Sequence, residues 1–142
     1  MSSITFDLLH QLPKGELHCH LDGCLRPKSI LDFALKDGVE LPSFDLAELT
    51  SYLKIGKKRG SLVDYIERFD ITLSVMQTPE SLTRFAFELI EDVAQENVRY
   101  IEVRYSPILH QQKGMTLDMA VESVKKGLKK GEKKFGVKSG II

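Results

Sequence analysis

The chain has 142 residues, of which 42% are hydrophobic and 28% charged, and its 20 basic and 20 acidic side chains leave no formal net charge. This balance predicts one globular domain and gives no basic excess of the kind that binds nucleic acid. Because no apolar run approaches the roughly 18 residues that a membrane span needs, and residues 1–12 lack a basic start followed by a long apolar core, we expect a cytoplasmic protein with no membrane partner.

The first predicted element is a strand at 16–22, whose side chains divide between two chemically different faces. Side chains alternate from one face of a strand to the other, so every second residue shares a face. One face carries Glu16, His18, His20 and Asp22, and the other carries Leu17, Cys19 and Leu21. We therefore expect one side to join the core and the other side to be available for chemistry.

His18 and His20 are the candidate metal ligands on the polar face. Two imidazoles one strand repeat apart, with the Asp22 carboxylate next in line, can converge on one ion. Each neutral ring can offer a nitrogen lone pair to zinc at about 2.0–2.1 Å. For a His-x-His pair taken alone, the alternative is a chance arrangement on a solvated edge strand.

The two cysteines of the chain are Cys19 and Cys24. They are too few and too close in sequence for a disulfide framework, so we expect reduced thiols. Because Cys19 lies on the face opposite the histidines, we expect its side chain to pack in the core.

Two short helices are predicted after the first strand. Pro27 near the start and Gly38 at the end bound one of them. Asp45, with Glu48 three residues later, predicts an N-cap and its capping-box partner for the next. The basic loop 54–60 follows, and we interpret it as solvated rather than as a phosphate site.

Two longer amphipathic helices come next. Ser61 is the predicted cap of the first, and the apolar positions of that helix, Leu62, Tyr65, Ile66, Phe69 and Leu73, have a 3.6-residue period. Thr78 and Pro79 start the second, which we expect to end near Asn97. Each helix should bury one face.

A second strand is predicted at 98–105, stopped by Ser106 and Pro107. Its two faces repeat the division of the first strand. The polar face carries Tyr100, Glu102, Arg104 and Ser106, and the apolar face carries Ile101, Val103 and Tyr105. We expect Glu102 and Arg104 to pair with each other.

A helix at 117–135 with a solvated, lysine-rich face and the start of a third strand at 136–142 complete the pattern. Strands alternating with helices predict a parallel α/β fold with right-handed crossovers. The polar faces of both strands favour a barrel over an open sheet. Because a complete (β/α)8 barrel of the TIM type needs about 250 residues, we interpret residues 1–142 as the N-terminal portion of one barrel domain, truncated in the third strand.

Residues 13–23, which read PKGELHCHLDG, resemble the first-strand signature of adenosine deaminases, the metal-dependent adenosine/AMP deaminase family of the amidohydrolase superfamily. Residues 98–107 (VRYIEVRYSP) resemble the second barrel strand of that family, and residues 131–138 (GEKKFGVK) its approach to the third. The resemblance covers the whole chain. The remaining part of the family's barrel carries the other zinc ligands, a histidine and an aspartate, and the catalytic groups. We therefore expect no catalytic residue in this segment.

The resemblance implies that His18 and His20 bind one Zn²⁺ per complete subunit, and that His20 also lies against the substrate. It further implies that Asp22 accepts a hydrogen bond from the ribose 5′-hydroxyl, and that Gly23 lets the chain turn out of the strand. The implied reaction is the hydrolytic deamination of adenosine, and of 2′-deoxyadenosine, to the inosine product and ammonia in purine salvage. The substrate is then a nucleoside, and the oligomeric state stays open.

Two alternatives remain beside this function. One is a related 6-aminopurine deaminase such as an adenine deaminase, although a 5′-hydroxyl contact from Asp22 is useful only for a nucleoside. The other is a non-catalytic fragment, if the chain ends at Ile142, and we expect the 142-residue chain alone to be inactive. The helix with Tyr65, Ile66 and Phe69 resembles the family's apolar lid, but the same spacing suits any core-facing helix.

Overall fold

The computed structural model of the chain describes residues 4–54 and 62–142, apart from the side chains of 62–65 and 67. The cap predicted at Ser61 and the loop prediction for 55–60 therefore lie outside the described residues. Three strands form one sheet: β1 (Lys14–His20), β2 (Val98–Arg104) and β3 (Lys138–Ile141). Their order is β1-β2-β3, and both neighbouring pairs are parallel, as predicted.

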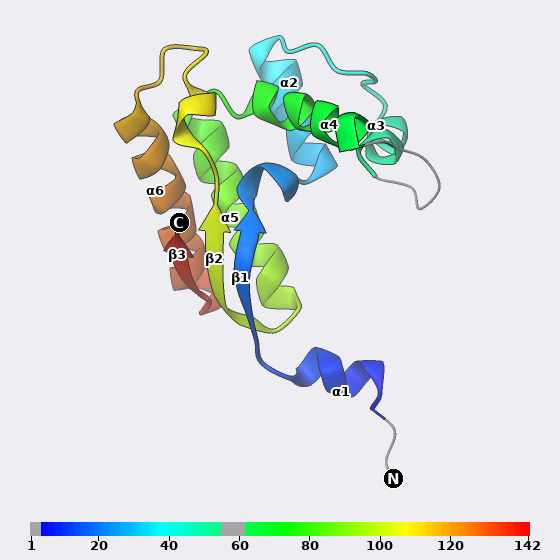
Figure 1. Ribbon diagram of the computed structural model, residues 1–142, viewed down its shortest axis with the longest axis vertical. Helices are drawn as coiled ribbons and strands as arrows, with labels where there is room; N and C mark the ends of the chain where they lie inside the picture. The colour runs from blue at the N-terminus through cyan, green and yellow to red at the C-terminus, as the bar shows by residue number, and fades with distance from the viewer. Residues whose placement is uncertain (1–3, 55–61) are drawn as a thin grey trace.

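Two long helices, α5 (Pro79–Gln95) and α6 (Leu117–Phe135), cover one face of this sheet (Figure 1). They approach each other closely because α6 presents glycines to α5. A Cβ atom at Gly127 would stand 2.3 Å from the Thr83 carbonyl oxygen, and one at Gly131 would stand 2.6 Å from the Ile90 Cβ. Any side chain at these positions would push the helices apart.

The hydrophobic core fills the space between the sheet and this helical layer. Its fully buried side chains include Leu21, Ile30, Leu82, Phe85, Ile90, Ile101, Val103 and Val124. The apolar stripes predicted for the helices at 27–38, 79–97 and 117–135 are confirmed by this burial, as is the apolar face of the second strand. No helix among the described residues is both long and apolar enough to span a bilayer.

The helix ends follow local sequence signals. Helix α2 (Pro27–Asp37) starts at its proline and ends at Gly38, which takes the left-handed conformation with φ 66°. Helix α5 starts at Thr78, whose hydroxyl accepts from the Ser81 N–H in a capping box. These predicted boundaries are confirmed.

Helix α3 (Leu46–Leu53) is capped by Asp45, whose carboxylate accepts from the N–H groups of Ala47 and Glu48. The N-cap prediction is therefore confirmed, whereas the capping-box partner was wrong. The Asp45 N–H donates to the Ser43 hydroxyl, and that hydroxyl in turn donates to the Glu48 carboxylate. Ser43 thus accepts the hydrogen bond from the Asp45 N–H that the capping-box pattern assigns to Glu48.

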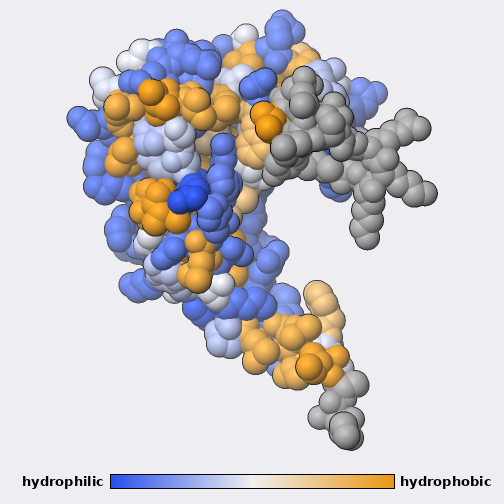
Figure 2. Space-filling model, in the orientation of Figure 1, coloured by the Kyte–Doolittle hydropathy of each residue, from blue (hydrophilic) through white to orange (hydrophobic). Residues whose placement is uncertain are grey.

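Four further elements complete the chain. Helix α4 (Leu62–Val75) lies with α2 and α3 at the carboxyl ends of the strands (Figure 1). Two single-turn helices, η1 (Leu21–Gly23) and η2 (Pro107–His110), follow β1 and β2 directly. Helix α1 (Phe6–Gln11) projects at the opposite end and buries none of its residues, so its apolar side chains stand out in Figure 2. The sequence patterns did not predict α1, η1 or η2.

One side of β1 departs from the predicted division into faces. Leu21 is fully buried and Cys19 is partly buried against the core, as expected, but Leu17 is 63% exposed. The reason is that β1 is an edge strand of the described sheet, and the helical layer lies mainly behind β2. The strand also ends at His20, so Leu21 and Asp22 belong to η1 instead.

Candidate functional site

His18 and His20 project together from the last residues of β1. Their Nε2 atoms lie 3.1 Å apart, and their ring centroids are separated by 5.1 Å. Two nitrogens bound to one tetrahedral zinc at 2.0–2.1 Å would stand about 3.3 Å apart. The two rings therefore already present their nitrogens at nearly the spacing that one zinc ion requires.

The donor set is a pair and not a complete metal cage. Within the described ranges, no group of three or more histidine, cysteine or acidic side chains could hold a metal. A catalytic zinc normally has three protein ligands and one open position. The residues present therefore fit zinc as two ligands of a site whose other ligands come from elsewhere.

Arg104 at the end of β2 is the third polar group at this edge of the sheet. In the parallel register of β1 and β2, Arg104 is the partner of His20. Its Nη1 lies 3.4 Å from His18 Nε2. The guanidinium can only donate, so this contact leaves the His18 nitrogen as the acceptor. A lone pair at His18 Nε2 is also what a metal would use.

The predicted ion pair between Glu102 and Arg104 is wrong. Glu102 instead accepts a hydrogen bond of 2.9 Å from the Tyr100 hydroxyl, which raises the pKa of Tyr100. Arg104 turns across the sheet to His18. Tyr100, Glu102 and Arg104 share one face of β2. Glu102 pairs with Tyr100, and Arg104 contacts His18, so the two predicted partners do not pair with each other.

Asp22 stays on the histidine side although it lies in η1 and not in the strand. Its Oδ1 is 3.6 Å from His20 Nδ1, and the side chain is 14% exposed. That oxygen is buried and has no hydrogen-bond partner among the described residues. A buried carboxylate oxygen without a donor is costly, and it can accept a hydrogen bond from a ligand.

A pocket of about 380 Å³ opens beside Asp22, at the carboxyl ends of the strands. Helix α4 forms one wall through Phe69, and a Cβ at Gly23 would stand 3.7 Å from the Phe69 ring. That distance is an ordinary contact, and Gly23 does not have a positive φ, so the turn itself does not require glycine. Ile66 is 56% exposed, and the Tyr65 side chain lies outside the described residues.

Behind the histidines, the thiols of Cys19 and Cys24 lie 3.4 Å apart, and both are free. The hydrogen bond between the two thiols lowers the pKa of Cys19 and raises the pKa of Cys24. The sequence predicted reduced thiols, with Cys19 in the core, but no contact between the two cysteines. The sequence signal for this contact is the position of Cys19 near the end of a strand and of Cys24 just after the turn that follows it.

His110 is the polar residue near this edge that no motif predicts. It is fully buried at the end of η2, with its ring centroid 5.7 Å from that of Tyr105. Burial lowers the pKa of His110, and the nearby Met76 backbone and Asp22 carboxylate offset this only in part. His110 therefore packs against Tyr105 at the strand ends.

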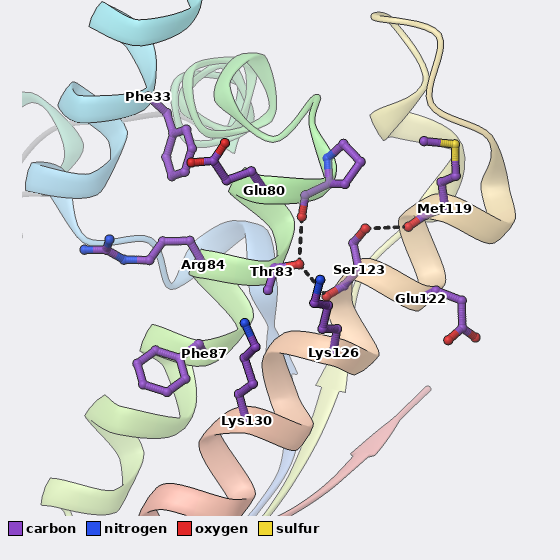
Figure 3. A pocket seen from close by; sticks show the side chains of 11 residues that line it. Phe33, Glu80, Thr83, Arg84, Phe87, Met119, Glu122, Ser123, Lys126 and Lys130 are labelled. Carbon is purple, nitrogen blue, oxygen red and sulfur yellow. Dashed lines mark hydrogen bonds between the residues drawn. The ribbon is translucent and has the colours of Figure 1, made fainter.

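A larger hollow, of about 750 Å³, lies elsewhere, between α5 and α6 on the helical side of the sheet (Figure 3). Glu80 and Glu122 on its rim pair with Lys36 and Lys125. It contains none of the histidines or buried carboxylates described above. The candidate site is therefore the smaller region at the carboxyl ends of β1 and β2, where barrel enzymes have their active sites.

Comparisons with known proteins cover nearly the whole chain. A family model described as adenosine deaminase matches residues 13–142. An adenosine deaminase of Clostridium botulinum (strain Loch Maree / Type A3) is 51% identical over 132 residues, which cover 93% of this chain and 39% of the relative. The chain therefore spans well under half the length of that relative.

Solved structures give the fold. An adenine deaminase from Arthrobacter aurescens matches with 29% identity and a TM-score of 0.77, covering 89% of this chain and 38% of that one. An amidohydrolase from Burkhoderia ambifaria with bound Zn matches with 26% identity and a TM-score of 0.80, covering 99% and 38%. The predicted fold class is confirmed: the three strands and their helices are the N-terminal part of a (β/α)8 barrel.

Proposed function

The chain belongs to the adenosine deaminase family, and from this premise we propose that residues 1–142 are the N-terminal portion of one barrel domain of a zinc-dependent adenosine deaminase. The complete enzyme converts adenosine, and 2′-deoxyadenosine, with water to the inosine product and ammonia in cytoplasmic purine salvage. The observation that carries the proposal is the convergence of His18 and His20, with Nε2 atoms 3.1 Å apart.

His18 and His20, together with ligands from the rest of the barrel, would hold one zinc per subunit, and the metal would supply the Lewis-acid activation of a water. The residues of this chain prepare that site. Asp22 lies 3.6 Å from His20 Nδ1. The Nε2 atom, on the other side of the His20 ring, lies 3.1 Å from the Nε2 atom of His18, where both could bind the metal.

Asp22 also orients the nucleoside. Its buried Oδ1 lacks a donor, and the ribose 5′-hydroxyl supplies one. His20 lies beside the same carboxylate and so borders the substrate as well as the metal. Phe69 of α4 lines the adjoining pocket and, with its helix, covers the nucleoside as an apolar lid.

Among the described residues, no third ligand joins the two histidines, and we propose that the 142-residue chain is inactive by itself. A second candidate function is deamination of free adenine, because one similar solved structure is an adenine deaminase. The unpaired Asp22 oxygen favours the nucleoside, since a free base has no hydroxyl to offer it.

The test uses the complete protein. His18→Ala or His20→Ala should abolish the ultraviolet change from adenosine to inosine and lower the zinc content, because either change leaves one strand ligand. His10→Ala is the matched control, since His10 is an exposed histidine on α1, at the opposite end of β1 from the site (Figure 1). Full turnover with stoichiometric zinc in both site variants would refute the metal assignment.

A further inference from the structure

Cys19 and Cys24 lie on either side of the residues that form the candidate site. Cys19 sits in β1 between His18 and His20, and Cys24 directly follows η1. Their sulfur atoms are 3.4 Å apart. A disulfide bond has an S–S length of about 2.0 Å, so the atoms need to close by only about 1.4 Å.

The two thiols differ in how firmly the backbone holds them. Cys19 is paired with Val103 in the parallel register of β1 and β2. Cys24 is an exposed residue at the end of a single turn, fixed by its N–H bond to the Leu21 carbonyl oxygen. Closing the gap therefore moves Cys24 and the turn more than it moves the strand.

We propose that Cys19 and Cys24 form an oxidation site, at which a peroxide joins them in a reversible disulfide that lowers deamination. This regulation rests on the proposed function of the same site. The protein keeps both thiols reduced under ordinary cytoplasmic conditions, where disulfides are transient and redox-dependent.

The chemistry is complete with a peroxide as the oxidant. One thiol, as thiolate, attacks a peroxide oxygen, so that the O–O bond breaks and a sulfenic acid and water result. The second sulfur then attacks the sulfenic sulfur and displaces its hydroxyl group as a second water. Two thiols are oxidised, the peroxide is reduced, and both thiol protons end in water.

The new ring would enclose the residues that the site uses. Between the two cysteines lie His20, Leu21, Asp22 and Gly23. Leu21 is fully buried and anchors the turn from below, so the displacement falls on Asp22 and on the strand end at His20. A shift of about 1 Å in a positioning group can cost up to about a hundredfold in rate.

The experiment treats the complete, zinc-loaded deaminase with hydrogen peroxide and then with dithiothreitol. Three quantities are followed: the mass of the peptide that contains both cysteines, the zinc content and the rate of adenosine deamination. We expect a peptide mass lower by two hydrogen atoms, a fall of about tenfold or more in deamination, and recovery of both after reduction. Cys24→Ser should deaminate normally and resist the peroxide, and Cys19→Ser should also fail to form the linkage.

Each outcome decides the matter. Sulfinic or sulfonic acid at either cysteine without the linked peptide would overturn the oxidation site, as would equal peroxide sensitivity in Cys24→Ser. A linked peptide with unchanged turnover would overturn the regulation. If the reduced protein does not deaminate adenosine, the proposed function fails, while the peptide mass still decides whether the bond forms.

Discussion

On one side of the sheet, His18, His20 and Arg104 are exposed and lie within 3.4 Å of their nearest partner in the group. On the other side, α6 approaches α5 so closely that a Cβ at Gly127 would stand 2.3 Å from a carbonyl oxygen. Exposed polar contacts of the first kind contribute little to stability. Close packing of the second kind contributes much, because the interior cannot absorb added volume.

The two sides of the sheet therefore have different roles: one carries the candidate site, and the other stabilises the fold. The histidine side can be altered with little effect on folding, so its residues are available for binding and chemistry. The helical side tolerates little change and holds β1 and β2 in the register that brings the histidines to Arg104. Substitutions on the two sides should therefore affect different measured quantities.

The largest effect on stability should come from Gly127→Val. Valine differs from glycine by only a few tenths of a kcal/mol in helix propensity, so the loss reports packing against Thr83 and Ala86. We expect the free energy of unfolding of the complete protein to fall by about 3 kcal/mol, measured by urea denaturation. Lys126→Ala, on an exposed position of the same helix, is the control and should change it by less than about 0.5 kcal/mol. An equal loss in both variants would contradict the close-packing argument.

A smaller effect, on binding and not on folding, should follow Asp22→Ala. If Asp22 accepts from the 5′-hydroxyl, its loss should lower kcat/KM for adenosine by about thirtyfold, equivalent to about 2 kcal/mol. The loss on 5′-deoxyadenosine should be much smaller, because that substrate offers no hydroxyl. 5′-Deoxyadenosine is the control substrate. Equal losses of kcat/KM on both substrates would show that Asp22 does not bind the 5′-hydroxyl.

The parts of the structure that were predictable are those specified locally. Helix α6 has the predicted bounds because Thr116 caps its start and Gly136, with φ 75°, ends it. The shared face of His18 and His20 follows from strand alternation alone. In both cases a short stretch of sequence contains the whole physical cause.

The errors arose where a distant element decides the outcome. Leu17 is exposed because β1 is an edge strand, and Arg104 bonds to His18 because parallel pairing places the two strand ends together. The contact between Cys19 and Cys24 depends on where η1 returns the chain. No periodicity within a single segment reports on these arrangements.

The smallest predicted effect concerns Glu132, which joins α6 to β3 and so belongs to the helical side. Its carboxylate accepts from the backbone N–H and the hydroxyl of Ser139 at 2.7 and 2.8 Å, and from Lys129. Burial alone would raise the pKa of Glu132, but these hydrogen bonds outweigh it and lower the pKa below its ordinary value of 4.5. A depressed carboxyl pKa stabilises the fold above the unfolded value, and that contribution is lost as the pH falls through the folded value.

Glu132→Gln keeps an acceptor for Ser139 but removes the charge, so the free energy of unfolding should fall by about 1 kcal/mol at pH 7. The difference from the unaltered protein should shrink as the pH falls from about 4.5 through the lower folded pKa, below which the carboxyl group is protonated in both states. Glu122→Gln is the matched control, since its side chain is 67% exposed and its carboxylate pairs with Lys125; it should change stability by a few tenths of a kcal/mol at either pH. Urea denaturation of the complete proteins at pH 7 and near pH 3 measures both. A loss in Glu132→Gln that is equally large at the two pH values would mean that the shape of the side chain, and not its charge, holds β3 to α6.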